Sequence, residues 1–417
     1  MRALLVPAVC ALLFGWGFLT HRSQVFPYGV VLSLAVATGL SEPDLPPARG
    51  AGAQESEPRL EALAVLESLP YIDSLPAERP EDRGVMRHDA SRVSPGMNFY
   101  NMTRKSRAIL MDMTGQIVHE WHYSTEGRGA WHHAELLDDG GILVVAQDAS
   151  VMRLDRDSNL TWVYEARAHH DLWVGADETI VFLGREAVMF AAIHPLLPVT
   201  DDRVITLSAD GRLLDEFSLV EVMLASPYAF LFSSIAERTF DKDVTEIDLF
   251  HANHVEILDG HLADRSPIYA QGNFLVSMKN INSIAILERD THEVLWIWGP
   301  NNVVLQHHPV MQPDGTILLF DNGTKFSRVL QLDPLSREVT WSYEDGEDFF
   351  SFWGGASQRL ANGNTLITET ARGEAFEVTP DGQVVWRFLN PDVDDKGRRW
   401  NIWRLTRHPM SELEFLQ

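Results

Sequence analysis

Hydrophobic and polar residues alternate along most of the chain from about residue 96, and acidic or polar turns interrupt the alternation at intervals. Six segments share one form, in which such a turn leads into an alternating strand that ends in an aromatic residue. These segments are 112–121, 155–162, 210–217, 290–296, 333–341 and 381–386. A strand and turn that recur in this way are typical of repeat folds.

One complete repeat unit can be followed from residue 132 to residue 165. Four short strands are predicted in it, at 133–137, 142–147, 150–154 and 160–164, and a turn at 138–141 joins the first two. Asp-Gly and Asn-Gly turns between alternating runs are strong hairpin signals, and the same pair of strands recurs at 310–320 and 358–368. Six units of four short antiparallel strands predict an all-β, six-bladed β-propeller.

The first unit lacks its first strand, and the end of the chain supplies a candidate for it. Strands are predicted at 100–102, 108–111 and 117–123, whereas the strand predicted at 400–405 has no partner of its own. Pairing the C-terminal strand with the first unit closes the ring and hides two sheet edges. The propeller domain is therefore predicted to span 96–417. The insertion at 219–248 is predicted to contain a helix, either as a binding loop or as decoration.

The first 95 residues differ in composition from the repeats. Residues 1–40 contain two apolar runs, at 4–19 and 25–40, and each is shorter than the roughly 20 residues of a spanning helix. The pattern favours an uncleaved signal anchor, with a cleaved signal peptide as the alternative. Residues 41–95 are predicted to be a linker with a short helix at 55–69 and an irregular stretch at 77–95. The propeller is thus expected outside the cytoplasm, in the periplasm or at the cell surface, and held at the membrane by its N-terminal segment.

The charge of the chain limits its partners. Lys and Arg total 34 against 59 Asp and Glu, a formal net charge of −25. Nucleic acid is not expected as a partner, because binding phosphates requires a basic surface. An anionic small substrate would need a locally positive pocket. The single cysteine, Cys10, excludes a disulfide within the chain and a cysteine-based zinc site.

Histidines recur at the start of the first strand in four of the units. They are His132-His133, His169-His170, His251 and His307-His308, and the sixth unit has Gly354-Gly355 at this position. The first strand of a propeller blade lines the central channel. His170, His251 and His307 are therefore expected to face one another across the channel mouth.

Three interpretations of this histidine cluster remain open from the residues alone. Neutral imidazole is a competent nucleophile at pH 7, and a second histidine can move protons. Clustered imidazoles also suit copper, zinc or iron. The third interpretation is a structural ring of hydrogen bonds. The chain has no His-Glu-x-x-His motif and no His-x-His pair, so we expect neither a metal nor another cofactor.

Several motifs resemble the bacterial aryl-sulfate sulfotransferase family, whose members do not use the nucleotide sulfate donor. The resemblance covers about residues 99–410 and rests on the segment 108–121, on the motifs 248–253 and 306–308, and on the segment 318–323. It implies a six-bladed periplasmic propeller. It also implies a reaction in which a channel histidine attacks an aryl sulfate, becomes sulfohistidine and releases a phenol, before a second phenol accepts the sulfuryl group.

The resemblance also implies roles for individual residues. His307 matches the nucleophile, and His251 and His170 match the histidines that handle protons and contact the sulfuryl group. Lys279 stands where the family has arginine. Lysine keeps the positive charge but lacks the bidentate fork of a guanidinium group. The substrate-binding residues are expected to be His169, Asn253, Asn280, His308 and Asn322.

Two further expectations qualify these roles. Strand alternation puts His308 on the opposite side of its strand from His307, where it is expected to pack between blades. The expected partners are small molecules, an aryl sulfate and a phenol. A propeller without catalytic activity, which binds a ligand or a protein at its channel face, is the alternative. The separate N-terminal β-domain of some family members has no counterpart here.

Overall fold

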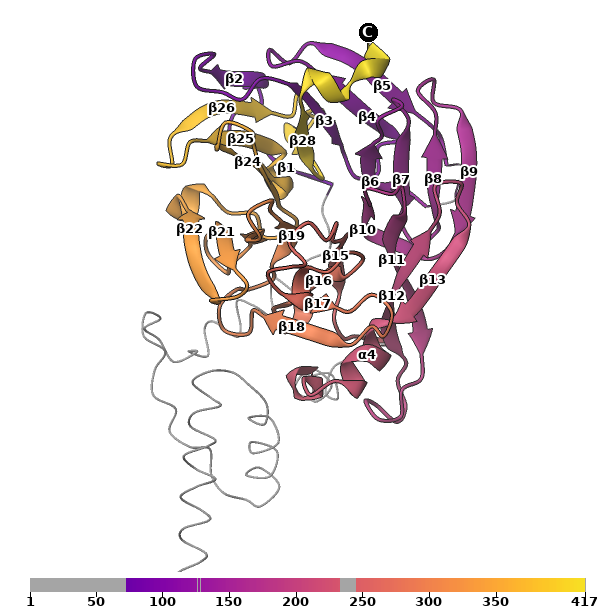
Figure 1. The fold of residues 1–417 in the computed structure, drawn as a ribbon. Coiled ribbons are helices and arrows are strands. Elements are labelled where there is room, and N and C mark those ends of the chain that lie inside the picture. Colours follow the sequence, from indigo (N-terminus) through magenta and orange to yellow (C-terminus); the bar gives the residue numbers. More distant parts are fainter. Residues whose placement is uncertain (1–72, 126, 128, 233–244, 417) are drawn as a thin grey trace, which may run out of the picture.

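The computed structural model describes residues 73–125, 127, 129–232 and 245–416. Six blades, each built on four antiparallel strands, are arranged around a central axis, as predicted, and they form an all-β propeller (Figure 1). A fifth strand is added to blades 3 and 6. Within these residues, no helix has the length and hydrophobicity that a membrane span requires. The two predicted apolar runs and the predicted helix at 55–69 lie outside the described residues.

The blades follow one another along the chain, and the first strand of each lies nearest the axis. Blade 1 contains β28 (Leu405–His408), β3 (Met97–Asn101), β4 (Arg107–Met111) and β5 (Ile117–His122). Blade 2 contains β6 (Trp131–Leu136), β7 (Ile142–Ala146), β8 (Ser150–Leu154) and β9 (Leu160–Glu165), and blade 3 contains β10 (Ala168–Val174), β11 (Ile180–Val188), β12 (Val199–Leu207) and β13 (Leu213–Ser218). Blade 4 contains β15 (Ala252–Ile257), β16 (Phe274–Met278), β17 (Ser283–Leu287) and β18 (Val294–Trp298). Blade 5 contains β19 (His307–Met311), β20 (Ile317–Asp321), β21 (Arg328–Asp333) and β22 (Glu338–Tyr343), and blade 6 contains β23 (Ala356–Arg359), β24 (Thr365–Glu369), β25 (Glu374–Val378) and β26 (Val384–Leu389).

Contacts between neighbouring blades explain the recurring aromatic residue. In five blades the tryptophan of the outermost strand donates its indole N–H to a turn carbonyl of the next blade. These bonds join Trp121 to Gly140, Trp162 to Ala209, Trp296 to Pro334, Trp341 to Pro380 and Trp386 to Met113. Phe217 of blade 3 has no donor and stacks instead on the His292 ring, with centroids 3.8 Å apart. The aromatic residue that recurs in the sequence therefore forms a contact between neighbouring blades in every repeat.

The end of the chain contributes two strands rather than one. β27 (Arg398–Trp400) pairs with β1 (Ser74–Pro76), and β28 pairs with β3, so that Leu405 lies opposite Tyr100. The bounds predicted for the C-terminal strand, 400–405, were wrong. Residues 401–404 are not a strand: the Trp403 N–H donates to the Asn101 carbonyl, and the side chains of Asn401 and Arg404 bind Thr103 and Asp171.

The stretch at 77–95, predicted to be irregular, also contains a strand. β2 (Gly84–His88) pairs with β26 and adds a fifth strand to the outer edge of blade 6. That prediction was wrong because the partner of β2 lies about three hundred residues away, and the short segment carries no alternation of its own.

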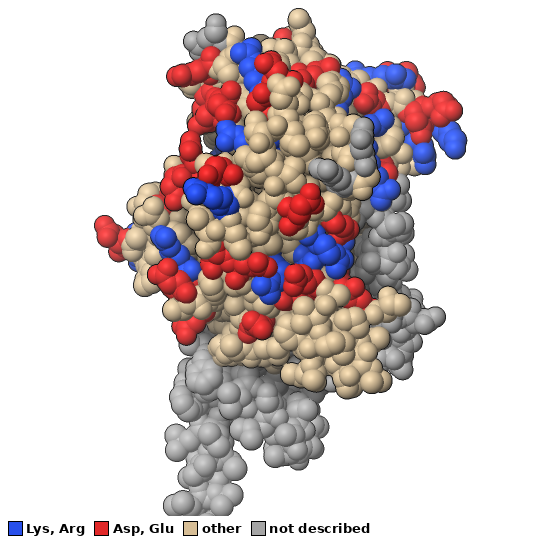
Figure 2. Space-filling model, turned by 90° about the vertical axis from the view of Figure 1, so that its right-hand side faces the viewer, with Lys and Arg blue, Asp and Glu red and all other residues tan. Residues whose placement is uncertain are grey.

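The insertion of blade 3 contains the predicted helix. The helix α4 (Leu219–Ala225) begins after Ser218, whose hydroxyl accepts the Glu221 N–H. It buries Leu219, Val220 and Met223 in the core that blades 3 and 4 share. The insertion then returns through β14 (Ile247–Asp248), parallel to β12, and leads directly to His251. On the flank shown in Figure 2, Lys and Arg side chains are scattered among Asp and Glu side chains.

Candidate active site

The backbone is unusual where the inner strands of blades 3, 4 and 5 begin. His170, His251 and His308 have φ angles of 56°, 47° and 48°, in the left-handed region that residues other than glycine rarely adopt. The pairing register of β10, β15 and β19 shifts at the same points. Strain repeated at one level of three blades marks a candidate functional site.

His170, His251 and His132 form a cluster of rings in the channel. The His170 ring lies 4.8 Å from the His251 ring and 5.0 Å from the His132 ring, measured between centroids. Trp403 packs against the His132 ring at 4.0 Å. His307 lies near enough to this cluster for positive charge on Lys279 or His251 to lower its pKa. Lys279 begins the short helix η3 (Lys279–Ile281) at the end of β16.

The His307 ring is held in one orientation and one tautomer. Its Nδ1 lies 2.7 Å from Asn322 Oδ1 and 2.8 Å from the Leu305 carbonyl oxygen. Both partners are acceptors, so Nδ1 carries the hydrogen and Nε2 holds the lone pair. Nε2 is buried and has no hydrogen-bond partner among the described residues. Burial lowers the pKa of His307 to about 3, against the effect of the Asn322 bond, so the ring is neutral at pH 7.

A second imidazole and a nearby carboxylate lie beside His170. His169 Nδ1 shares a hydrogen with His170 Nδ1 at 2.7 Å, and His169 Nε2 lies 3.1 Å from Asp202 Oδ1 without forming a hydrogen bond to it. Burial and the neighbouring His251 lower the pKa of His170 well below its usual value.

His251 is oriented by a single carboxylate. Its Nδ1 donates to Asp248 Oδ2, which leaves Nε2 as the basic nitrogen. Burial lowers the pKa of His251, and the Asp248 carboxylate opposes that effect. Burial raises the pKa of Asp248, but His251 and Lys279 outweigh it and hold the pKa below its usual range. His251 and His307 thus both have Nε2 unprotonated.

The three asparagines predicted to bind substrate have their amide groups engaged by the protein. Asn322 Nδ2 donates to the carbonyls of Ser351 and Gly354, while its Oδ1 accepts from His307. Asn253 Nδ2 donates to the Gln306 carbonyl at 2.8 Å, which ties β15 to β19. Asn280 Nδ2 donates to the Asp248 carbonyl at 2.8 Å. These side chains therefore hold the histidine-bearing segments in place.

The two glycines that precede the first strand of blade 6 allow blade 5 to approach closely beside the histidine cluster. Gly354 and Gly355 have φ angles of 64° and 131°. A Cβ atom on Gly355 would overlap the Phe320 ring, and the Gly354 carbonyl receives the Asn322 amide. Blade 6 thus contributes the bond that fixes Asn322, and through it His307, instead of a histidine.

A second group of polar side chains lies beside the first and centres on Asp171. This carboxylate is fully buried and accepts from Arg404 Nη2 at 2.9 Å and from His254 Nδ1 at 2.5 Å. His133 Nε2 lies 3.6 Å away. Although burial raises it, Arg404 and His254 hold the pKa of Asp171 well below its usual range. Blades 2, 3 and 4 and the segment before β28 therefore meet at one carboxylate.

His308 belongs to this second group and contacts both neighbouring blades. Its ring lies 5.1 Å from the His254 ring of blade 4, and its Nδ1 accepts from the Ser357 N–H of blade 6 at 3.4 Å. The left-handed backbone at His308 and the shift in register between His307 and Val310 break the regular alternation on which the prediction relied.

No group of three or more His, Cys, Asp or Glu side chains within the described ranges is arranged to hold a metal ion. His169, His251, His254 and His307 each have a protein partner on Nδ1. A neutral imidazole held in this way can act as a nucleophile or move a proton.

Comparisons with known proteins concern the family and the fold of this chain. The model of one protein family, described as arylsulfotransferase (ASST), matches residues 133–391, which is more than half of the chain. The chain belongs to the arylsulfotransferase family. The match begins at the first histidine strand and includes every residue that we predicted for the site. No curated protein matches the chain in sequence.

Solved structures with the same fold are distant from this arylsulfotransferase family member in sequence. A protein of unknown function from Bacteroides caccae is 14% identical, with a TM-score of 0.51 over 75% of this chain and 98% of that chain. An inactive variant of virginiamycin B lyase from Staphylococcus aureus, solved with quinupristin, is 12% identical, with a TM-score of 0.40 over 64% of this chain and 73% of that chain. The first similarity supports the propeller fold.

Reasoning from the sequence missed the acidic residues that lie beside the histidines of this arylsulfotransferase family member. Asp202 lies within β12 and Asp171 within β10, and both are buried. An aspartate inside an apolar strand is unfavourable unless it is paired, and this was the available signal. Trp403 and Arg404 gave a weaker signal, because their strand-like surroundings concealed that both side chains cross the channel.

The buried imidazoles predict that this protein loses stability in mild acid. Burial lowers the pKa of His132 and of His307 to about 3, whereas an unfolded histidine titrates near 6.5. Between these values the unfolded chain binds protons that the folded state does not. The free energy of unfolding should therefore decrease as the pH is lowered below about 6.5, by about 1.4 kcal/mol per pH unit for each such imidazole.

Urea denaturation at several pH values between 7 and 4.5 measures this slope. His307→Gln is expected to make the slope shallower, whereas His88→Gln, at an exposed position, should leave it unchanged. A free energy of unfolding that does not vary over this range would contradict the burial of neutral imidazoles.

Proposed function

We propose that the protein is an arylsulfotransferase that moves a sulfuryl group from an aryl sulfate to a phenol through a sulfohistidine at His307. One observation carries the proposal. Two oxygen acceptors hold the hydrogen of His307 on Nδ1, so that a neutral, buried Nε2 lone pair has no hydrogen-bond partner among the described residues. Membership of the arylsulfotransferase family supports the reaction class.

In the first half of the proposed reaction, His307 Nε2 attacks the sulfur of the aryl sulfate. The N–S bond forms, and the S–O bond to the ring breaks and leaves its electron pair on the phenolate. The imidazole gains positive charge, which the oxygens of Asn322 and Leu305 stabilise through the Nδ1 hydrogen. The ammonium group of Lys279 stabilises the sulfuryl oxygens.

In the second half, an acceptor phenol replaces the product. Its hydroxyl proton passes to His251 Nε2, which Asp248 keeps as the basic nitrogen, or to the neighbouring His170. The phenolate oxygen then attacks sulfur, the N–S bond breaks, and its electron pair returns to His307 Nε2. A covalent intermediate splits one difficult transfer into two easier ones.

Rapid mixing of the full chain with a chromogenic aryl sulfate, without an acceptor, tests this proposal. We expect a burst of phenol equal in amount to the enzyme, followed by turnover only when a phenol is added. A protein that binds the aryl sulfate without a burst would support the alternative of a propeller without catalytic activity. Phenol release that requires an added metal would instead indicate metal-dependent hydrolysis.

Substitution of Lys279 tests the charge stabilisation. Lys279→Ala is expected to slow turnover by an amount equivalent to a few kcal/mol at most, because it removes one cation near the sulfuryl oxygens. Lys279→Arg keeps that charge and should be more active than Lys279→Ala. The rates kcat and kcat/KM of the three proteins with one aryl sulfate provide the comparison. Equal rates in all three would show that Lys279 has no part in the reaction.

The location of the protein is a further part of the proposal. The apolar runs at 4–19 and 25–40 support an N-terminal membrane anchor, with the propeller outside the cytoplasm. A reporter that works only in an extracytoplasmic compartment, fused after Gln417, is expected to be active. Activity of a strictly cytoplasmic reporter at the same position would contradict this location.

A further inference from the structure

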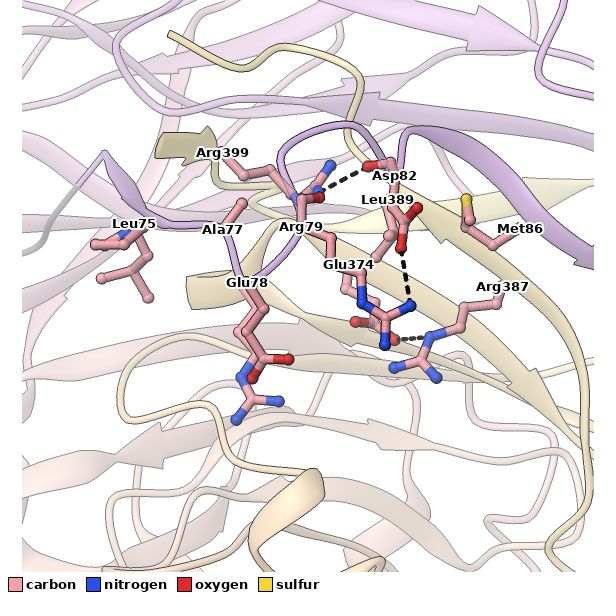
Figure 3. Close-up of a pocket in the computed structure, with 12 residues that line it drawn as sticks. Leu75, Ala77, Glu78, Arg79, Asp82, Met86, Glu374, Arg387, Leu389 and Arg399 are labelled. Atoms are coloured by element: carbon pink, nitrogen blue, oxygen red, sulfur yellow. Dashed lines mark hydrogen bonds and ion pairs between the residues drawn. The ribbon is translucent and has the colours of Figure 1, made fainter. Parts of the chain in front are cut away.

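A pocket of about 420 Å³ lies where the N-terminal segment crosses blade 6 (Figure 3). One wall is the segment from β1 to β2, and the other is formed by β25, β26 and β27. None of its lining residues belongs to the histidine cluster. Leu75 connects the two regions, because it lines the pocket and also packs against the cluster of Trp353 and Trp403.

The charge in this pocket differs from that of the chain as a whole. Four guanidinium groups line it, against three carboxylates, whereas the chain has 34 basic and 59 acidic residues. The guanidinium groups belong to Arg79, Arg372, Arg387 and Arg399, and the carboxylates belong to Glu78, Asp82 and Glu374. Figure 3 shows the Arg79 guanidinium beside the pair that Glu374 and Arg387 form.

Two of the four cations already have a carboxylate that lines the pocket. Arg387 Nε lies 2.6 Å from Glu374 Oε1, and Arg79 Nη1 lies 3.8 Å from Asp82 Oδ2. The third carboxylate, Glu78, is exposed at the rim. The remaining cations, Arg372 and Arg399, therefore give the inner part of the pocket a positive charge.

Arg399 is a buried cation held by neutral groups. Only 5% of the residue is exposed, and its Nη atoms donate to the carbonyls of Asn390 at 2.7 Å and Asp82 at 2.8 Å. No carboxylate lies within 4.0 Å of its guanidinium nitrogens in the described part of the chain. Burial lowers the pKa of Arg399, and the Glu374 carboxylate, which pairs directly with Arg387, opposes that effect. An anion in the pocket would further offset the cost of burying the Arg399 charge.

Arg372 has a partner that carries little negative charge at neutral pH. Its Nε lies 3.2 Å from Glu369 Oε1, and Glu369 is itself buried at the end of β24. Burial raises the pKa of Glu369 to about 8, so this carboxyl group is mostly protonated at pH 7. The Arg372 guanidinium is therefore available to a second, charged acceptor.

Shape and lining indicate the kind of anion. A guanidinium group is a planar fork that matches the oxygens of a carboxylate, sulfate or phosphate group in a bidentate manner. Leu75, Met86 and Leu389 add apolar surface to the same pocket. A volume of about 420 Å³ exceeds what an inorganic ion fills and lies within the range of small-molecule sites.

We propose that this arginine pocket binds the oxyanion group of a small organic molecule, at a site separate from the channel histidines. Arg372 and Arg399 bind the oxyanion, and the apolar side chains contact the organic part. The site does not depend on the proposed reaction, since it shares no residue with the histidine cluster.

Calorimetric titration of the full chain tests the proposal, at constant ionic strength with chloride as the balancing anion. The probes are inorganic sulfate, an aryl sulfate and an aryl carboxylate. Arg372→Gln is expected to weaken binding of the organic anions at least tenfold. The matched control is Arg212→Gln, which also removes one cation that pairs with a carboxylate, but on blade 3 with 80% of the side chain exposed.

Two further variants separate this site from the channel and from effects on folding. Lys279→Ala should leave binding at the arginine pocket unchanged, whereas a loss in that variant alone would place the anion in the channel. Arg399→Gln should also weaken binding, provided that its melting temperature shows a folded protein. Saturable binding that is equal in the wild type and Arg372→Gln would overturn the proposal, as would the absence of saturable binding for all three probes.

Discussion

Replacement of His307 with alanine is expected to abolish both the phenol burst and the covalent adduct. The rate with an aryl sulfate should fall by about 10³-fold or more, as it does when a catalytic nucleophile is lost. The physical reason is that His307 provides the Nε2 lone pair whose ring is fixed by Asn322 and Leu305. Intact-mass measurement after rapid mixing should find one added sulfuryl group on the wild type and none on His307→Ala.

His308→Ala is the matched control for this experiment. His308 is the adjacent imidazole, but it faces His254 and the group around Asp171. This variant should still form the adduct, with some loss of stability. If the adduct survives in His307→Ala, or never forms in the wild type with any aryl sulfate, the proposed mechanism is wrong. The propeller without catalytic activity would then be the better interpretation.

Removal of the residues after Asp395 is expected to prevent stable folding. The deletion takes away β28 and exposes the edge of β3. It also removes Arg404, the cation bound to the buried Asp171, and Arg407, which pairs with the buried Glu377. Circular dichroism should show no cooperative melting transition. A truncated protein with an unchanged melting temperature would contradict the role of the C-terminal strand.

Two controls separate the contributions of strand and charge. A protein ending at Pro409 keeps β28 and loses the buried Leu413, so it should fold with a lower melting temperature. Arg404→Met keeps every strand but leaves the Asp171 carboxylate without its cation. Breaking a buried ion pair in this way typically costs about 3–5 kcal/mol.

Local signals in the sequence predicted most of the blades. Strand β8 has the predicted bounds, and β7 and β9 differ from the prediction by one residue each, because Asp-Gly turns and alternation act over a few residues. The same reasoning failed for β2, whose partner β26 is distant in the sequence. Pairings of that kind depend on packing after the ring has formed, and no short segment encodes them.

The candidate site was predictable to a similar extent. Repeat positions brought His170, His251 and His307 into one cluster, as expected. The tautomers of His251 and His307 depend on Asp248 and Asn322, and the sequence pattern did not show that these side chains would bind the two rings. The place of His308 depends on a left-handed backbone angle, which alternation does not predict.

The pairing of β3 with β28 has a consequence for biosynthesis. Tyr100 is made about three hundred residues before Leu405, so blade 1 stays one strand short while those residues are added. At a typical elongation rate this interval is roughly 15 to 60 seconds. During it the nascent chain presents an open β-edge, and Asp171 has no Arg404 to bind. The protein is therefore expected to depend on chaperones until β28 has been made.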